Sequence, residues 1–390
     1  MLMKLRYLLL LSLLSFYNAF GQESFPINGV ADTYKPIYAF TNAHIVLSPT
    51  TEITNGTLLI QGDKILAADS NITIPNNAII KDLDGDYIYP SFIDLYTNYG
   101  LPAVQRGKYN YRPQYNSNKA GAYHWNESIH PEIKASNEYS GNKKDAEAFI
   151  KNGFGAVLTH NQDGIFRGTG CLTLLSEGNS QENILIADAG SFYSFNKGVS
   201  HQKYPSSLMG SIALIRQTLL DAAWISQSKD HTNLSLSAYN NQVDLPQFFS
   251  VQNILDYQRV FKIADEFEID YIIKGNGKEY SRIEEVKSTE FPVIIPLNFP
   301  KSYDISNPEA TEWISLAKLK DWESSPFNPA ILAHHEVEFC ITSSDLDKAS
   351  DFLKNLKLAI KKGLKKEDAL AALTTTPAGL INASNILGTI

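Results

Sequence analysis

The amino-acid sequence predicts an α/β fold, with a parallel sheet or barrel that follows a small β domain. The chain has 390 residues, 43% of them hydrophobic and 19% charged, which is an ordinary globular composition with enough length for a large core. Short β-rich segments separated by turns fill residues 37–84. Beyond residue 145, apolar strands alternate with amphipathic helices, as they do in folds built on a parallel sheet.

The N-terminal residues 1–21 have the pattern of a secretory signal peptide. Lys4 and Arg6 precede an apolar run from Tyr7 to Phe16, and Ala19-Phe20-Gly21 supplies small residues before a cut at Gln22. The run is too short to span a bilayer comfortably, so an uncleaved anchor is the weaker alternative. We therefore expect an exported protein, periplasmic or extracellular, with no membrane insertion after cleavage.

The charge balance argues against polyanionic partners. The formal net charge is −8, and no basic cluster interrupts it, so nucleic acid and anionic membranes are not expected to bind. Cys171 and Cys340 each lie in an apolar stretch. Buried free thiols are the favoured interpretation, and a disulfide is the alternative that export would permit.

Residues 37–89 are predicted to form the small β domain. Strands are expected at 43–47, 57–60 and 64–67, separated by turns at Asn55-Gly56 and Gly62-Asp63.

Next, residues 87–100 begin the main domain, because an apolar run broken by Pro90 leads into the short strand Phe92-Ile93 and then into polar residues.

Residues 101–140 are rich in Tyr, Asn and Gly and predict a long loop over the mouth of the sheet. His124, Glu127 and His130 would share one face of a helix, but Pro131 opposes a long helix there. A structural role for these residues is the favoured interpretation. An alternative is that this aromatic-rich segment binds a sugar or a peptide.

The strand 156–160 follows a helix predicted over 145–152, and a glycine-rich turn at 163–170 precedes another strand at 171–175. His160 and Arg167 flank the end of the first of these strands, where ligand groups gather in parallel folds. Solvated loop positions are an equal alternative for both side chains.

Later residues continue the alternation. Helices are predicted over 209–224 and 253–267, and strands over 269–273 and 290–296.

Two motifs resemble the amidohydrolase superfamily, in its imidazolonepropionase-like branch. Pro90, Phe92, Ile93 and Asp94 match the family's first barrel strand, with Ser91 in place of a glycine. The segment 337–345 resembles the last barrel strand, and residues 363–378 and 387–390 resemble the closing segments.

The resemblance implies a TIM-like (β/α)8 barrel over 90–390 and a small β-sandwich domain. In the family a further strand follows the position of Ile390 and completes the sandwich. A downstream catalytic module or a homo-oligomer is therefore an expected partner.

The resemblance also implies a reaction, the hydrolysis of C–N bonds other than peptide bonds by water activated on divalent metal, usually zinc. The family's two metal-binding histidines fall on Tyr96 and Asn98, whose side chains are poor zinc ligands. A middle strand ends in Lys274 without histidine. Asp345 matches the family's catalytic, metal-contacting aspartate, although capping of the following helix by Ser344 or Asp345 is the favoured interpretation.

The leading hypothesis is a secreted amidohydrolase-like pseudoenzyme that serves as a scaffold or binding module for a small molecule, without a metal cofactor. Its candidate site comprises Asp345 as the catalytic match and Tyr96, Asn98, His160, Arg167 and Lys274 as binding residues. The alternative is an active metal-dependent hydrolase whose ligands are relocated. Those ligands would come from His124, His130, His160, His334, His335 and Asp345.

Overall fold

A computed structural model describes residues 35–105, 115–176, 181–228, 230–304, 306 and 312–390. The predicted signal peptide, 1–21, lies outside these residues. The described chain divides into two compact units, 35–44 with 54–86, and 45–53 with 87 onward.

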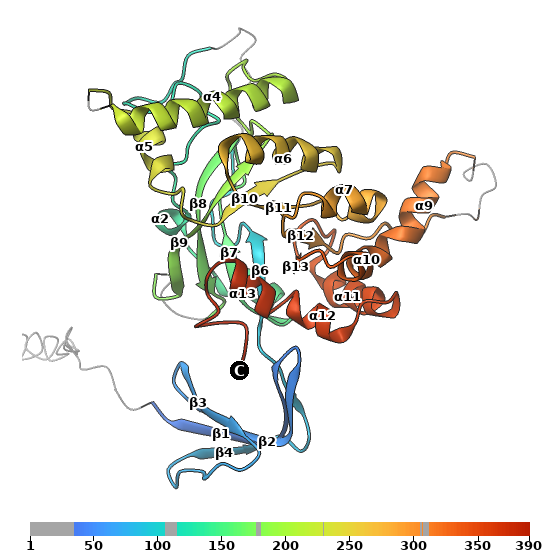
Figure 1. Ribbon diagram of the computed structural model, residues 1–390. Coiled ribbons are helices and arrows are strands. Elements are labelled where there is room, and N and C mark those ends of the chain that lie inside the picture. The colour runs from blue at the N-terminus through green and yellow to red at the C-terminus, as the bar shows by residue number, and fades with distance from the viewer. Residues whose placement is uncertain (1–34, 106–114, 177–180, 229, 305, 307–311) are drawn as a thin grey trace, which may run out of the picture. The chain divides into compact units, whose positions relative to one another are not determined.

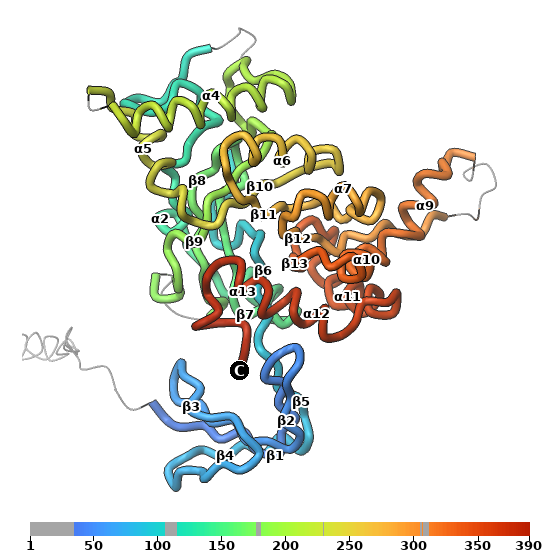
Figure 2. The backbone as a smooth tube through the Cα atoms, viewed as in Figure 1, coloured from blue at the N-terminus to red at the C-terminus, as the bar shows by residue number. Residues whose placement is uncertain are grey.

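The first β-rich segment forms one sheet in the order β3-β2-β1-β4, and β5, labelled in Figure 2, pairs with β1. Its strands are β1 Ile37–Ser48, β2 Thr51–Gln61, β3 Lys64–Asp69, β4 Ile79–Asp82 and β5 Tyr87–Ile88. The predicted turn at Gly62-Asp63 joins β2 to β3 as a hairpin. The turn predicted at Asn55-Gly56 is wrong, because both residues lie inside β2, where Asn55 adopts a φ of 57°.

The resemblance implied two packed sheets in this region, but the described residues form only one. The side chains of β3 and β4 are exposed or half-buried along their whole length.

The second sheet has eight strands in the order β13-β12-β11-β10-β9-β8-β7-β6. The strands are β6 Phe92–Thr97, β7 Phe154–Thr159, β8 Phe166–Leu174, β9 Ile184–Ser194, β10 Gln247–Ser250, β11 Tyr271–Lys274, β12 Val293–Pro296 and β13 Phe339–Thr342. The predicted strands at 156–160, 269–273 and 290–296 all fall on members of this sheet, and β13 lies within the segment 337–345 that resembles the family's last barrel strand.

One strand departs from the all-parallel pattern of a (β/α)8 barrel. β8 runs antiparallel to both β7 and β9, whereas the other neighbouring pairs are parallel. Only residues 160–165 separate β7 from β8, too few for the crossover that a parallel pairing needs. The glycine-rich segment predicted as a turn therefore lies largely within a strand, because β8 already begins at Phe166.

Most strands of this sheet are apolar on both faces. Ile272, Ile294 and Cys340 pack together on one face, and their neighbours Ile273 and Ile341 pack on the other. This second face meets the helices, and Figure 1 shows α6, α7, α10 and α11 along the outside of β10 to β13. Burial of both faces is the usual reason why such strands are continuous apolar runs.

The helices predicted over 145–152, 209–224 and 253–267 correspond to α3, α4 and α6, within a few residues of those bounds. The helices of the described residues are α2 Ala135–Glu138, α3 Lys143–Ile150, α4 Leu208–Gln227, α5 Leu234–Asn240, α6 Leu255–Phe267, α7 Ile283–Lys287, α9 Leu316–Ser324, α10 Asn328–His334, α11 Phe352–Lys361, α12 Lys366–Ala371 and α13 Thr375–Leu380. By length and composition alone, α4 is long and apolar enough to cross a membrane. Its buried face, however, includes Leu214, Leu219 and Ala222, as expected of a helix that packs on a core.

The two outer strands of the large sheet, β6 and β13, are linked by hydrogen bonds rather than by a strand ladder among the described residues. The backbone N–H groups of Ile93 and Ile341 donate to the carbonyls of Leu373 and Ala372, respectively. Thr342 Oγ1 also donates to Asp94 Oδ1 at 2.6 Å. The carboxyl ends of β6 and β13 are thereby held together, which positions the site described next.

Candidate functional site

Three of the predicted site residues extend the inner faces of their strands to the carboxyl-terminal edge of the sheet. On β7, Ala156 and Leu158 belong to the inner apolar cluster, and His160 follows at the same two-residue interval. On β11, Ile272 is followed in the same way by Lys274. Tyr96 belongs to the inner cluster itself. Because side chains alternate along a strand, the sequence places these three groups above the apolar interior.

Arg167 joins this edge from β8. Since β8 is antiparallel, its beginning lies at the edge where the parallel strands end. The Arg167 side chain is 6% exposed. Its Nη1 donates to the Tyr96 hydroxyl at 3.0 Å and its Nε donates to the Gly164 carbonyl at 3.1 Å. Of the two equal alternatives for Arg167, the solvated loop position is wrong, because Arg167 is a buried residue of the reversed strand.

Lys274 links Tyr96 to Asp345. Its Nζ donates to Asp345 Oδ2 and to the Gly275 carbonyl, both at 2.7 Å. The same Nζ lies 5.2 Å from the centroid of the Tyr96 ring, within the range of a cation–π contact. Tyr96, His160, Arg167, Lys274 and Asp345 are called the strand-end cluster below.

The helix-cap interpretation of Asp345 is wrong. The helix that follows, α11, begins at Phe352, and neither Ser344 nor Asp345 caps it. Six residues separate Asp345 from the helix, so its carboxylate is free to pair with Lys274. Local sequence favoured the cap because the turn and the 3₁₀ segment Ala349–Asp351 before the helix were not foreseen.

His160 is fully buried between two aromatic rings. Its ring stacks on Phe192 at a centroid distance of 3.6 Å and meets the Tyr96 ring edge-on at 4.6 Å. Neither ring nitrogen has a hydrogen-bond partner in the described part of the chain. Burial, and secondarily the nearby Arg167 charge, lower the pKa of His160 well below its usual value. The imidazole is therefore neutral near pH 7.

Asp94 belongs to the site although it was identified only as part of the fold motif. Its carboxylate is completely buried and accepts hydrogen bonds from Thr342 Oγ1, from the Ser343 backbone and hydroxyl, and from the Tyr96 backbone, at 2.6 to 3.1 Å. Burial raises the pKa of Asp94, while the bonds from Ser343 and Thr342 oppose that rise. The signal in the sequence was an acid in an otherwise apolar strand.

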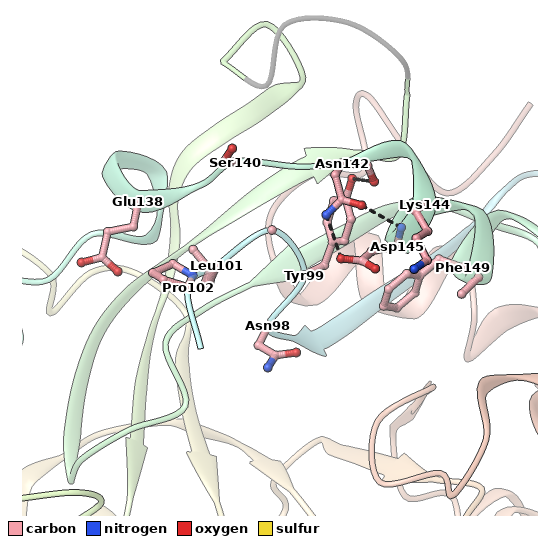
Figure 3. A pocket seen from close by; sticks show the side chains of 12 residues that line it. Asn98, Tyr99, Leu101, Pro102, Glu138, Ser140, Asn142, Lys144, Asp145 and Phe149 are labelled. Carbon is pink, nitrogen blue, oxygen red and sulfur yellow. Dashed lines mark hydrogen bonds between the residues drawn. The ribbon is translucent and has the colours of Figure 1, made fainter. Parts of the chain in front are cut away.

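The structure places Asn98 outside the strand-end cluster. It lies just beyond the end of β6, is exposed, and lines a different pocket with Tyr99, Glu138, Asn142 and other residues (Figure 3). In that pocket the Asn142 side chain accepts from the Asp145 backbone and donates to the Asp145 carboxylate. These bonds cap α3. Tyr96 and Asn98 therefore do not act on one ligand from adjacent positions.

The other candidate histidines do not gather. His124 and His130 lie in a segment without helix, so the shared helical face considered for them does not form. Burial lowers the pKa of each to about 4. His334 and His335 end α10, and His335 faces Glu284 at 3.4 Å. Among the described residues, no three His, Cys, Asp or Glu side chains are grouped closely enough to hold a metal ion.

The donor set of the strand-end cluster is likewise unsuited to a divalent metal. It presents two cations, Lys274 and Arg167. Of the two carboxylates described for the site, Asp345 pairs with Lys274, and Asp94 already accepts hydrogen bonds from Thr342 and Ser343. Zinc sites use uncharged imidazoles, thiolates or carboxylates that face the ion. The residues present therefore do not fit the metal that the resemblance implies.

No protein-family model matches the chain, and no curated protein matches it in sequence. Among solved structures, an amidohydrolase from Thermotoga maritima is similar with a TM-score of 0.69 and 19% identity, over 90% of this chain and 91% of that one. A prolidase complexed with N-methylphosphonate-L-proline has a TM-score of 0.49 and 13% identity, over 91% of this chain and 90% of its own. A. niger ochratoxinase has a TM-score of 0.46 and 10% identity, over 91% of this chain and 87% of its own.

Proposed function

Starting from the amidohydrolase fold that the Thermotoga likeness shows, we propose that this chain is a binding module. Its strand-end cluster binds a small molecule that bears a carboxylate, and it does so without metal catalysis. The proposed site lies at the carboxyl ends of the strands, where barrel folds carry their active sites. The function assigned to it, binding of a carboxylate, is one that its cationic residues can perform.

The observation that carries the proposal is the buried charge of Arg167. A guanidinium stays protonated in proteins, yet the partners of Arg167 are two neutral oxygen atoms, the Tyr96 hydroxyl and the Gly164 carbonyl. Within the described ranges no carboxylate pairs with it. A buried unpaired charge costs several kcal/mol. An anionic ligand would offset that cost, and the guanidinium fork matches a carboxylate in geometry.

The surroundings of Arg167 favour an organic carboxylate over a simple inorganic anion. Tyr96 connects Arg167 to the second cation, Lys274. Behind Tyr96, the rings of His160 and Phe192 stack on each other in the buried interior, so the ground beneath the two cations is aromatic and apolar rather than solvated. The two unpartnered nitrogens of the neutral His160 ring offer one donor and one acceptor to such a ligand.

The test is a calorimetric titration with N-acetylglycine, with the uncharged N-acetylglycinamide as the matched probe. We expect N-acetylglycine to bind and Arg167→Met to weaken its binding at least about tenfold, the loss of a charge-assisted hydrogen bond. Arg282→Met is the control, because Arg282 is exposed and pairs with Glu285 at the surface. Equal binding of both probes, or equal affinity in wild type and Arg167→Met, would refute the proposal.

The second candidate function is metal-dependent hydrolysis with relocated ligands. Elemental analysis of the purified protein separates it from binding alone. We expect no stoichiometric metal, because the family's first two ligand positions hold Tyr96 and Asn98. About one tightly bound zinc per chain, together with release of glycine from N-acetylglycine, would favour the hydrolase instead.

A further inference from the structure

We propose that Asp345 is an internal competitor: its carboxylate occupies the place of the ligand's carboxylate on Lys274 and leaves when the ligand binds. The inference rests on the proposed function and goes beyond it, because it identifies the cation that receives the ligand's charge and the group that must be displaced.

The first argument is that Lys274 already holds a carboxylate. Asp345 Oδ2 lies 2.7 Å from Lys274 Nζ, a normal distance for a charge-assisted hydrogen bond. The Nζ group is fixed by a second bond to the Gly275 carbonyl and by the Tyr96 ring. This part of the cluster is therefore built for one carboxylate, and a ligand that carries one competes directly with Asp345.

The second argument is the unequal burial of the two partners. The Lys274 side chain is 4% exposed, whereas that of Asp345 is 53% exposed. Lys274 cannot leave without losing the packing of β11. Asp345 needs only a rotation of its side chain to reach water, where a carboxylate is well solvated. Of the two partners, therefore, only Asp345 can be displaced.

The third argument is the turn that carries Asp345. Ser343 is anchored by two hydrogen bonds to Asp94, and the Ser344 backbone N–H donates to Thr342 Oγ1. Within the described ranges, Asp345 has no comparable anchor, and its φ of 60° lies in the left-handed region, which residues with a Cβ rarely adopt. The contact with Lys274 therefore helps to hold a conformation that the turn does not otherwise favour.

The test compares Asp345→Ala and the nearly isosteric Asp345→Asn with Asp347→Ala. Asp347 lies on the same segment but pairs with the exposed Lys301, so it is a matched control. With N-acetylglycine as the probe, we expect the affinity to rise about tenfold in Asp345→Ala and to rise in Asp345→Asn. Asp347→Ala should leave it unchanged. Lys274→Met should weaken binding and abolish the gain when combined with Asp345→Ala. Thermal melting checks that each variant is folded.

The outcomes separate the two proposals. If the wild type binds N-acetylglycine in an Arg167-dependent way but Asp345→Ala binds no more tightly, Asp345 is not a competitor and the proposed function stands. If Asp345→Ala weakens binding, Asp345 contacts the ligand and the inference is equally overturned. If neither wild type nor Asp345→Ala binds the probe, the proposed function fails, and the inference fails with it.

Discussion

The carboxylate of Asp94 connects the two outer strands of the large sheet. The hydrogen bonds that it accepts from Thr342 and Ser343 fix the turn that leads to Asp345. The hydrogen bond that it accepts from the Tyr96 backbone N–H fixes Tyr96 itself. In the sequence, Asp94 is only part of the motif that marks the fold. Its contacts with residues about 250 positions away explain why an acid is tolerated in a strand with no exposure to water.

At this scale we expect Asp94→Ala to lower the free energy of unfolding by at least about 2 kcal/mol. The substitution leaves the buried Thr342 hydroxyl and the half-buried donors of Ser343 without an acceptor, and an unsatisfied buried donor costs about 1–3 kcal/mol. Urea denaturation measures the change. Asp94→Asn retains one acceptor and should lose less. A stability equal to that of the wild type in Asp94→Ala would show that these bonds do not hold the outer strands together.

At the scale of the element, β8 is the strand that decides the site. It reverses direction, brings Arg167 to the carboxyl edge of the sheet, and lies beside residues 129–134, with isolated bridges at Ile129–Phe166 and Lys134–Thr169. The close approach requires glycine. Gly168 has a φ of 81°, and a Cβ there would lie 1.9 Å from the Ile133 carbonyl oxygen.

We therefore expect Gly168→Ala to destabilise the protein by several kcal/mol, the combined cost of a disfavoured φ and a backbone clash. It should also weaken N-acetylglycine binding, because Arg167 is the adjacent residue. Gly379→Ala is the control. That glycine lies in α13 with no atom closer than 4.0 Å to the added Cβ, and alanine there should be neutral or stabilising by up to about 1 kcal/mol. Equal melting temperatures for the two variants would contradict this account of β8.

At the scale of the whole molecule, buried histidines make stability depend on pH. Burial lowers the pKa values of His124 and His130 to about 4 from an ordinary value of 6.5. Between these two values the unfolded chain binds protons that the folded chain does not. The stabilisation is therefore complete above pH 6.5 and is lost as the pH falls towards 4.

We expect each of these histidines to remove about 2 kcal/mol of unfolding free energy between pH 7 and pH 5. Urea unfolding at several pH values, compared for wild type and His130→Gln, measures one of the two contributions as a flatter profile in the variant. His201→Gln, at an exposed position, should leave the profile unchanged. A profile in His130→Gln as steep as that of the wild type would show that His130 becomes protonated without unfolding.

The sequence by itself determined the α/β class, the positions of most strands and the likeness to the amidohydrolase fold. It also named Tyr96, His160, Arg167 and Lys274 as candidate residues. The fold class, the strands and the choice of His160 and Arg167 follow from local information, because alternation along a strand and helical spacing are properties of neighbouring residues. Tyr96 and Lys274 were named because the resemblance places them where the family carries histidines. Tertiary structure decided the reversed direction of β8, the ion pair between Lys274 and Asp345 and the separation of Asn98 from Tyr96. Each of these depends on which distant segments meet, and the free energy of such contacts is absent from any local stretch of sequence.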